Sequence, residues 1–148
     1  MMRKMASTLG FASLFILGAP ATGYSDSLPA FTGHTYYEGY DSCFSPIAPY
    51  APGGIGIVNN NCDTVDYVIP IQSRATGYWT FNATGYGGFP CWIIGKDYYS
   101  GSTVVSGYVG SLSGRNSLGR LYVPSNAVLY YYCNVPTGGQ LMSVDWTQ

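Results

Sequence analysis

The sequence predicts an all-β fold, a single antiparallel β-sandwich of about seven or eight strands, and three observations favour it. From residue 55 onward, short β-branched and aromatic runs alternate with turn residues at the spacing typical of sandwiches and barrels. No stretch combines helical periodicity with helix caps. Charged residues are only 9% of the chain, so Tyr, Gly, Ser, Thr and Asn must fill the surface, as in many extracellular β-proteins.

The first 21 residues have the three-part pattern of a secretory signal peptide. A basic start, MMRK, precedes a mostly apolar stretch over residues 5–18, and Ala19-Pro20-Ala21 supplies small residues for cleavage. The apolar stretch is shorter than the roughly 20 residues that cross a bilayer. We therefore expect cleavage, no stable membrane insertion, and a protein that is secreted or periplasmic.

After cleavage, residues 22–148 would carry four basic and seven acidic side chains, a formal charge of −3. Such a mildly acidic chain lacks the basic footprint that binds nucleic acid or an anionic membrane, so we expect no nucleic-acid partner. The length suits one domain with its own hydrophobic core.

Residues 22–54 show no clear period and predict an irregular N-terminal arm before the sandwich at residues 55–148. The segment SPIAPYAPGG (45–54) contains three prolines and two glycines, which disfavour regular strands. The arm also holds the only histidine, His34, and several tyrosines: Tyr24, Tyr36, Tyr37, Tyr40 and Tyr50.

Eight runs predict the strands of the sandwich. They are IGIVNN (55–60), TVDYVIPI (64–71), GYWTFNA (77–83), PCWIIGKD (90–97), STVVSGYVG (102–110), LGRLYV (118–123), AVLYYYCNV (127–135) and LMSVDWT (141–147). In the third run, alternation places Trp79 and Phe81 on one face and Tyr78 on the other. Pro70 indicates a strand end or an edge. Turns are expected at YYSG (98–101), at SGRNS (113–117) and between the other runs.

An even number of cysteines in an exported chain predicts two disulfides among Cys43, Cys62, Cys91 and Cys133. Four cysteines allow three pairings. A zinc site is disfavoured because no two cysteines are close in sequence and His34 is remote from them. We therefore expect no metal and no cofactor.

Cys91 and Cys133 each lie within a strong strand, and they predict an aromatic face. If these strands are antiparallel neighbours with the cysteines opposite each other and bonded, residues 91–94 lie opposite residues 133–130. Ile93 and Tyr131 would then share the core side with the cysteines. The outer side would carry four uncharged side chains, Trp92, Ile94, Tyr130 and Tyr132. A bond between two stacked sheets, as in immunoglobulin domains, is the alternative.

Four segments resemble a functionally uncharacterised family of small secreted bacterial β-rich proteins. They are GIGIVNN (54–60), YVIPI (67–71), CWIIGKDYYSGSTVVSG (91–107) and YYYCNVPTGGQLMSVDW (130–146). The family pattern runs Gly-Ile/Val-x-Asn, then Cys-Pro, then Tyr-x-Cys-x-Val/Leu-Pro. This chain departs from it at Ile69-Pro70 and has Cys62 earlier instead. The resemblance implies an extracytoplasmic β-rich domain with no stated activity. It also implies that Cys43 bonds to the cysteine of the second strand; because this chain has Ile69 there, we predict a Cys43–Cys62 bond instead.

The sequence offers no candidate catalytic residue, and we predict that the protein is not an enzyme. No serine lies in a Gly-x-Ser-x-Gly elbow. No facing pair of carboxylates is indicated: Asp63 and Asp66, three residues apart, are expected on opposite strand faces. The segment NNNCD (59–63) could offer oxygens to calcium but is expected to be a turn. NAT (82–84) is a glycosylation sequon.

Exposed aromatic rings on a weakly charged β-scaffold suit sugars, because ring faces stack on apolar C–H surfaces while hydroxyls meet Asn, Ser and Thr. We predict a binding module whose partner is a glycan or another cell-surface polymer, with Trp92, Tyr130, Tyr132 and Ile94 as the ligand-binding residues. Two alternatives stay open for this face: the arm covers it as a second small core, or it self-associates in an extracellular coat or matrix protein. A secreted toxin or inhibitor ranks below these. The sequence sets no oligomeric state.

Overall fold

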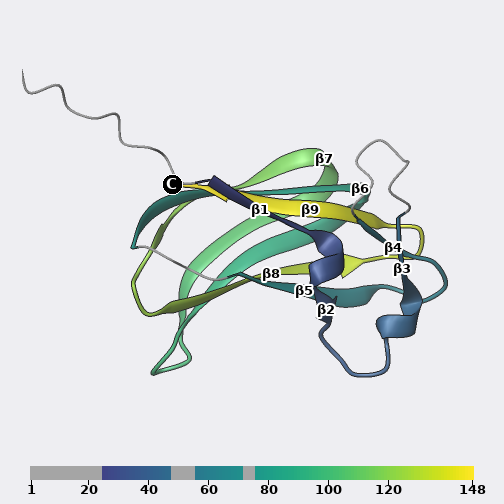
Figure 1. Ribbon diagram of the computed structural model, residues 1–148, viewed down its shortest axis with the longest axis horizontal. Helices are drawn as coiled ribbons and strands as arrows, with labels where there is room; N and C mark the ends of the chain where they lie inside the picture. The colour runs from purple at the N-terminus through teal and green to yellow at the C-terminus, as the bar shows by residue number, and fades with distance from the viewer. Residues whose placement is uncertain (1–24, 48–55, 72–75) are drawn as a thin grey trace, which may run out of the picture.

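The structure is a computed structural model that describes residues 25–47, 56–71 and 76–148. The predicted signal peptide and parts of the predicted arm, residues 22–24 and 48–54, lie outside the described residues. The described residues form antiparallel strands and two short 3-10 helices, which confirms the predicted all-β class (Figure 1). Both predicted disulfides, Cys43–Cys62 and Cys91–Cys133, are also confirmed.

The nine described strands follow the chain in order. They are β1 (Ser25–Pro29), β2 (His34–Thr35), β3 (Phe44–Pro46), β4 (Ile57–Asn59), β5 (Val65–Ile71), β6 (Gly77–Asp97), β7 (Thr103–Val123), β8 (Ala127–Val135) and β9 (Gln140–Thr147). The 3-10 helices are η1 (Ala30–Thr32) and η2 (Asp41–Cys43). None of the described residues belongs to a helix with the length and apolarity to span a membrane.

β6 and β7 are each 21 residues long, and each replaces two predicted strands. The glycine-rich segment between the two runs of β6 was expected to be a turn. Instead the ladder with β7 shifts register between Gly85 and Phe89, and Gly88 has a φ of 68°. Glycine in this backbone region makes a bulge that bends a strand without ending it. β6 and β7 therefore continue as one bent ribbon.

The bent ribbon divides the sheet into two layers (Figure 1). In the first, the second half of β6 lies between β7 and β8, and β5 and β2 follow beyond β8. In the second, the first half of β6 lies between β7 and β9, and the far edge of β9 pairs with β1 and β4. We call these the β8 layer and the β9 layer.

The segment expected to be an irregular arm has only short elements, yet it is built into both layers. β1 pairs with β9, β2 pairs with β5, and β3 pairs with β4. These strands have two to five residues, too few for a periodic pattern to appear in the sequence. Pro29 and Pro46 stand at the ends of β1 and β3, where a missing N–H group is tolerated.

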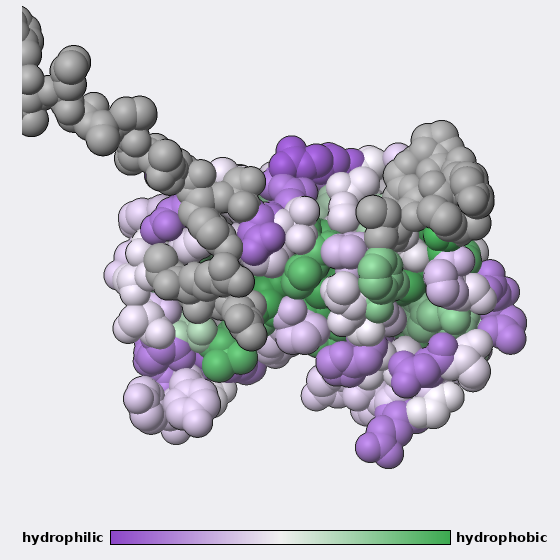
Figure 2. Space-filling view, viewed as in Figure 1, coloured by the Kyte–Doolittle hydropathy of each residue, from purple (hydrophilic) through white to green (hydrophobic). Residues whose placement is uncertain are grey.

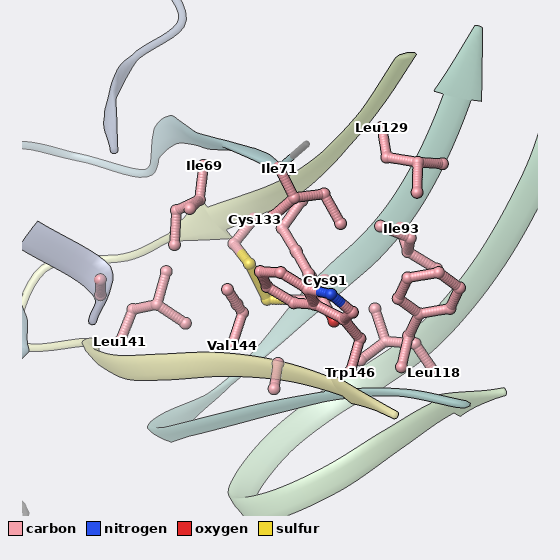
Figure 3. Packing of buried hydrophobic residues seen from close by; sticks show 14 of the residues in the cluster. Ile69, Ile71, Cys91, Ile93, Leu118, Leu129, Cys133, Leu141, Val144 and Trp146 are labelled. Atoms are coloured by element: carbon pink, nitrogen blue, oxygen red, sulfur yellow. A yellow bond between two sulfur atoms is a disulfide. The ribbon is translucent and has the colours of Figure 1, made fainter. Parts of the chain in front are cut away.

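The core fills the space between the layers (Figure 3). Ile69 and Ile71 of β5 and Val144 and Trp146 of β9 point toward the Cys91–Cys133 disulfide from opposite sides. All of these side chains are buried. The disulfide therefore lies at the centre of the core.

One buried hydroxyl ties the two layers together. Tyr131 of β8 is fully buried, and its hydroxyl donates a hydrogen bond to the backbone carbonyl of Asp145 in β9, at 2.9 Å. Burial raises the pKa of this phenol well above its usual value, so it stays a donor. Tyr131 thus belongs to the core, as the alternation within β8 predicts.

Candidate binding face

The predicted pairing of β6 with β8 is confirmed by the register. Residues 91–97 lie opposite residues 133–127, with Trp92 opposite Tyr132. The disulfide joins the directly opposed Cys91 and Cys133, whose Cα atoms are 4.2 Å apart. Both cysteines lie in the β8 layer, so the alternative of a bond between stacked sheets does not apply.

Aromatic rings form a row across the strands of the β8 layer. The Trp92 ring centroid lies 5.6 Å from that of Tyr132 and 5.1 Å from that of Tyr108 in β7. Tyr36, which follows β2, meets Tyr132 edge-on at 6.0 Å. Because adjacent strands hold their opposed side chains close together, the ladder itself sets this spacing. We call Tyr36, Tyr132, Trp92 and Tyr108 the aromatic row.

The rings of this row are accessible. Tyr36 and Tyr108 expose 59% and 56% of their surface, and Trp92 and Tyr132 are half-buried. Tyr36 brings the N-terminal segment to the border of the face without burying it. The described part of the segment therefore covers the Tyr132 end of the row and leaves part of every ring in the row accessible.

The two sides of the row differ in polarity. On one side, Asp66 of β5 lies opposite Asn134 of β8, whose side-chain amide donates to the Asp66 carboxylate. On the other side, the predicted residues Tyr130 and Ile94 lie opposite each other and are half-buried. The row is thus flanked by hydrogen-bonding groups along one side and apolar groups along the other.

The Tyr132 hydroxyl belongs to the polar side. Burial raises the pKa of Tyr132 to about 12, and a hydrogen bond with Asp66 contributes in the same direction. The phenol therefore stays protonated and uncharged at physiological pH. Asp66 accepts a hydrogen bond from the Asn134 amide, which fixes the orientation of these two side chains.

A pocket with a volume of about 520 Å³ lies next to the polar side of the row. Its walls are Tyr37 and Tyr40 on one side and residues 61–66 on the other. Asp63 and Asp66 both line this pocket, although their spacing predicted opposite faces. Alternation does not apply to Asp63, because β5 begins only at Val65.

In each of two other sequence motifs, one asparagine is buried and forms hydrogen bonds that stabilise the fold. Asn59 ends β4 and is fully buried, and its amide donates to the carbonyls of Asp63 and Val135, which holds the bend that follows at residues 61–64. Asn82 of the sequon is buried and donates to Asp145. In the part of the chain that the structure describes, no three His, Cys, Asp or Glu side chains cluster as metal ligands would.

Two smaller groups of exposed aromatics lie elsewhere. Tyr78 and Tyr122 pair on the outer side of the β9 layer, and Arg120 lies 5.5 Å from the Tyr78 ring centroid. Tyr98 and Tyr99 stand at the turn between β6 and β7. Neither smaller group continues across several strands as the aromatic row does.

On the side of the molecule that Figure 2 shows, hydrophobic residues form a central band with hydrophilic residues around it.

Solved structures share this fold. The C-terminal CBM6 of LamC, a marine laminarinase from Zobellia galactanivorans, matches 84% of this chain and 100% of its own, with a TM-score of 0.52 at 13% identity. The GH26-CBM35 β-(1,4)-mannanase of Podospora anserina matches 82% of this chain and 27% of its own, with a TM-score of 0.52 at 8% identity. At such identities the likeness establishes the fold alone. No protein-family model and no curated protein sequence matches the chain.

Proposed function

We propose that this protein is a secreted or periplasmic, non-catalytic module that binds a glycan, such as a polysaccharide of a cell envelope, through the aromatic row. The observation that carries the proposal is the position of Trp92, with its ring between those of Tyr108 and Tyr132 on an accessible sheet face. The fold supports it, because the two similar structures are a carbohydrate-binding module and an enzyme that contains one.

The chemistry of the face favours a sugar over other ligands. Aromatic rings bury apolar area at a small cost in side-chain entropy, since each ring rotates about only two torsions. Asp66 and Asn134 add an acceptor and an amide beside the rings, which suit hydroxyl groups. No described Lys or Arg belongs to the row or to its polar side, so nothing there attracts phosphate or sulfate.

The experiment is a binding screen of oxidised protein from which residues 1–21 have been removed. Insoluble and soluble laminarin, mannan and xylan would be the uncharged probes, and polygalacturonate the acidic one. We expect binding to at least one uncharged polymer, with little dependence on salt because no ion pair forms. Failure to bind any of them, or binding only to polygalacturonate that salt abolishes, would contradict the proposal.

Self-association is the second candidate function, and one observation favours it. Among the described strands, β7 pairs only with β6, which leaves its other edge open along 21 residues. Open edges promote pairing between copies. However, Gly114 and Gly119 have φ values of 76° and 121°, and Arg120 adds charge, features that interrupt such edges. Arg115 is already ion-paired with Asp145 of β9. Sedimentation over a range of concentrations would reveal oligomers if this edge were used.

A further inference from the structure

The pocket beside the aromatic row is held open by covalent and backbone links between its walls. The Cys43–Cys62 disulfide connects the segment that carries Tyr37 and Tyr40 to the turn that begins the other wall. The Tyr36 amide donates to the Asp66 carbonyl at 2.9 Å, and the Asn60 amide donates to the Cys43 carbonyl at 2.9 Å. A ligand that enters therefore finds a formed site and need not order two loops.

The side chains that line the pocket suit an uncharged, hydroxyl-rich ring. Tyr37 and Tyr40 expose 60% and 48% of their surface and offer apolar ring area. Asp63 and Asp66 supply carboxylate oxygens, which accept hydrogen bonds from sugar hydroxyls more strongly than neutral acceptors do. None of the described Lys and Arg residues lines the pocket, so a carboxylated or sulfated sugar would meet only repulsion there.

The pocket and the aromatic row are continuous. Tyr37 of the pocket wall meets Tyr36 of the row at a centroid distance of 5.0 Å. Asp66 lines the pocket and lies close enough to Tyr132 of the row to contribute, after burial, to the raised pKa of that phenol. A glycan chain bound along the row could therefore extend into the pocket. The pocket volume lies in the range of sites that bind small molecules.

We propose that the pocket binds the terminal sugar unit of an uncharged glycan, while the following units lie on the aromatic row. This inference rests on the proposed function and extends it. The row alone would accept any internal stretch of a chain. The pocket adds recognition of the chain end, and its two carboxylates select against acidic sugars.

The test compares intact laminarin and mannan with their partial hydrolysates, which hold many more chain ends at the same mass. We expect the affinity of the wild-type protein, by mass, to rise with the number of ends. Tyr40→Ala and Asp63→Asn should each weaken binding of the hydrolysate roughly tenfold, the effect of losing one well-placed contact. Asp63→Asn should also raise the affinity for polygalacturonate fragments, because it removes one of the two repelling carboxylates. Tyr99→Ala, at the remote turn, is the matched control and should bind like wild type.

The outcomes separate this inference from the proposed function. If Trp92→Ala loses binding while Tyr40→Ala and Asp63→Asn bind hydrolysate like wild type, the pocket does not bind the glycan. The inference is then wrong, and the proposed function of the row is retained. If affinity by mass is the same for polymer and hydrolysate, the inference that the pocket recognises chain ends is wrong. If wild type binds neither probe, or if Trp92→Ala binds like wild type, the row fails, and the inference fails with it.

Discussion

Replacing Trp92 with alanine is expected to weaken glycan binding by at least roughly 30-fold, because truncating a central aromatic contact of an interface costs about 2 kcal/mol or more. Trp92 is the middle ring of the row, in contact with Tyr132 on one side and Tyr108 on the other. Its loss removes the largest ring and also the support of both neighbours. Isothermal titration calorimetry with the polymer found in the screen measures the change.

The controls for this substitution are chosen from the same fold. Tyr78→Ala removes an exposed ring from the β9 layer and should leave affinity unchanged. Trp92→Phe keeps an aromatic face and should retain part of the binding. Circular dichroism establishes that each variant is folded, which we expect because Trp92 points away from the core. Equal affinity of wild type and folded Trp92→Ala would show that the ligand binds elsewhere.

Removing the Cys91–Cys133 bond is expected to have the largest effect on stability. The bonded residues are 42 positions apart, and closing a loop of this length stabilises the folded state by about 4 kcal/mol in the chain-entropy model. Both cysteines are fully buried among Ile69, Val144 and Trp146, so alanines would also leave a cavity. The variant with Cys91→Ala and Cys133→Ala should lose at least this amount in urea denaturation, or fail to fold.

The second disulfide provides the matched comparison. Cys43 and Cys62 are 19 positions apart, for which the same model gives about 3 kcal/mol. Cys62 is partly exposed and lies at the edge of the pocket, so its loss leaves a smaller cavity in the core. The variant with Cys43→Ala and Cys62→Ala should therefore remain folded and be the more stable of the two. The reverse order of stability would contradict the placement of Cys91–Cys133 at the centre of the core.

The register of β6 and β8 was predictable because two cysteines opposite each other fix it. Side chains alternate along a strand, so one correct pair places every other residue of both strands. Trp92, Tyr132, Tyr130 and Ile94 therefore reached the outer face as the sequence predicts. Whether a glycan binds there stays a prediction.

Two members of the row could not be found in this way. Tyr108 lies opposite Trp92, but the ladder between β6 and β7 shifts by one residue between Gly95 and Lys96. Counting back from the turn at residues 98–101 without that shift would have placed Tyr108 on the wrong side. Tyr36 follows a strand of only two residues, whose partner no pattern in the sequence indicates.

The sequence could not predict the pocket, for a different reason. Its walls come from Tyr37 and Tyr40 and from residues 61–66, which are brought together by the Cys43–Cys62 bond and by the pairing of β2 with β5. The pairing of these cysteines was predicted only through a family resemblance. No pattern in the sequence predicted the pairing of β2 with β5. A cavity between two such segments depends on their placement, which local patterns do not encode.

The most direct test of the central claim is acrylamide quenching of tryptophan fluorescence, with and without the glycan. The chain has three tryptophans, and Trp79 and Trp146 expose only 3% and 5% of their surface. Quenching therefore reports on Trp92. A loss of quenching in Trp92→Phe would verify this assignment. If the glycan lies on the aromatic row, saturating ligand should protect Trp92 and reduce quenching to the level of that variant. Saturation of the protein with glycan while quenching stays unchanged would contradict the account.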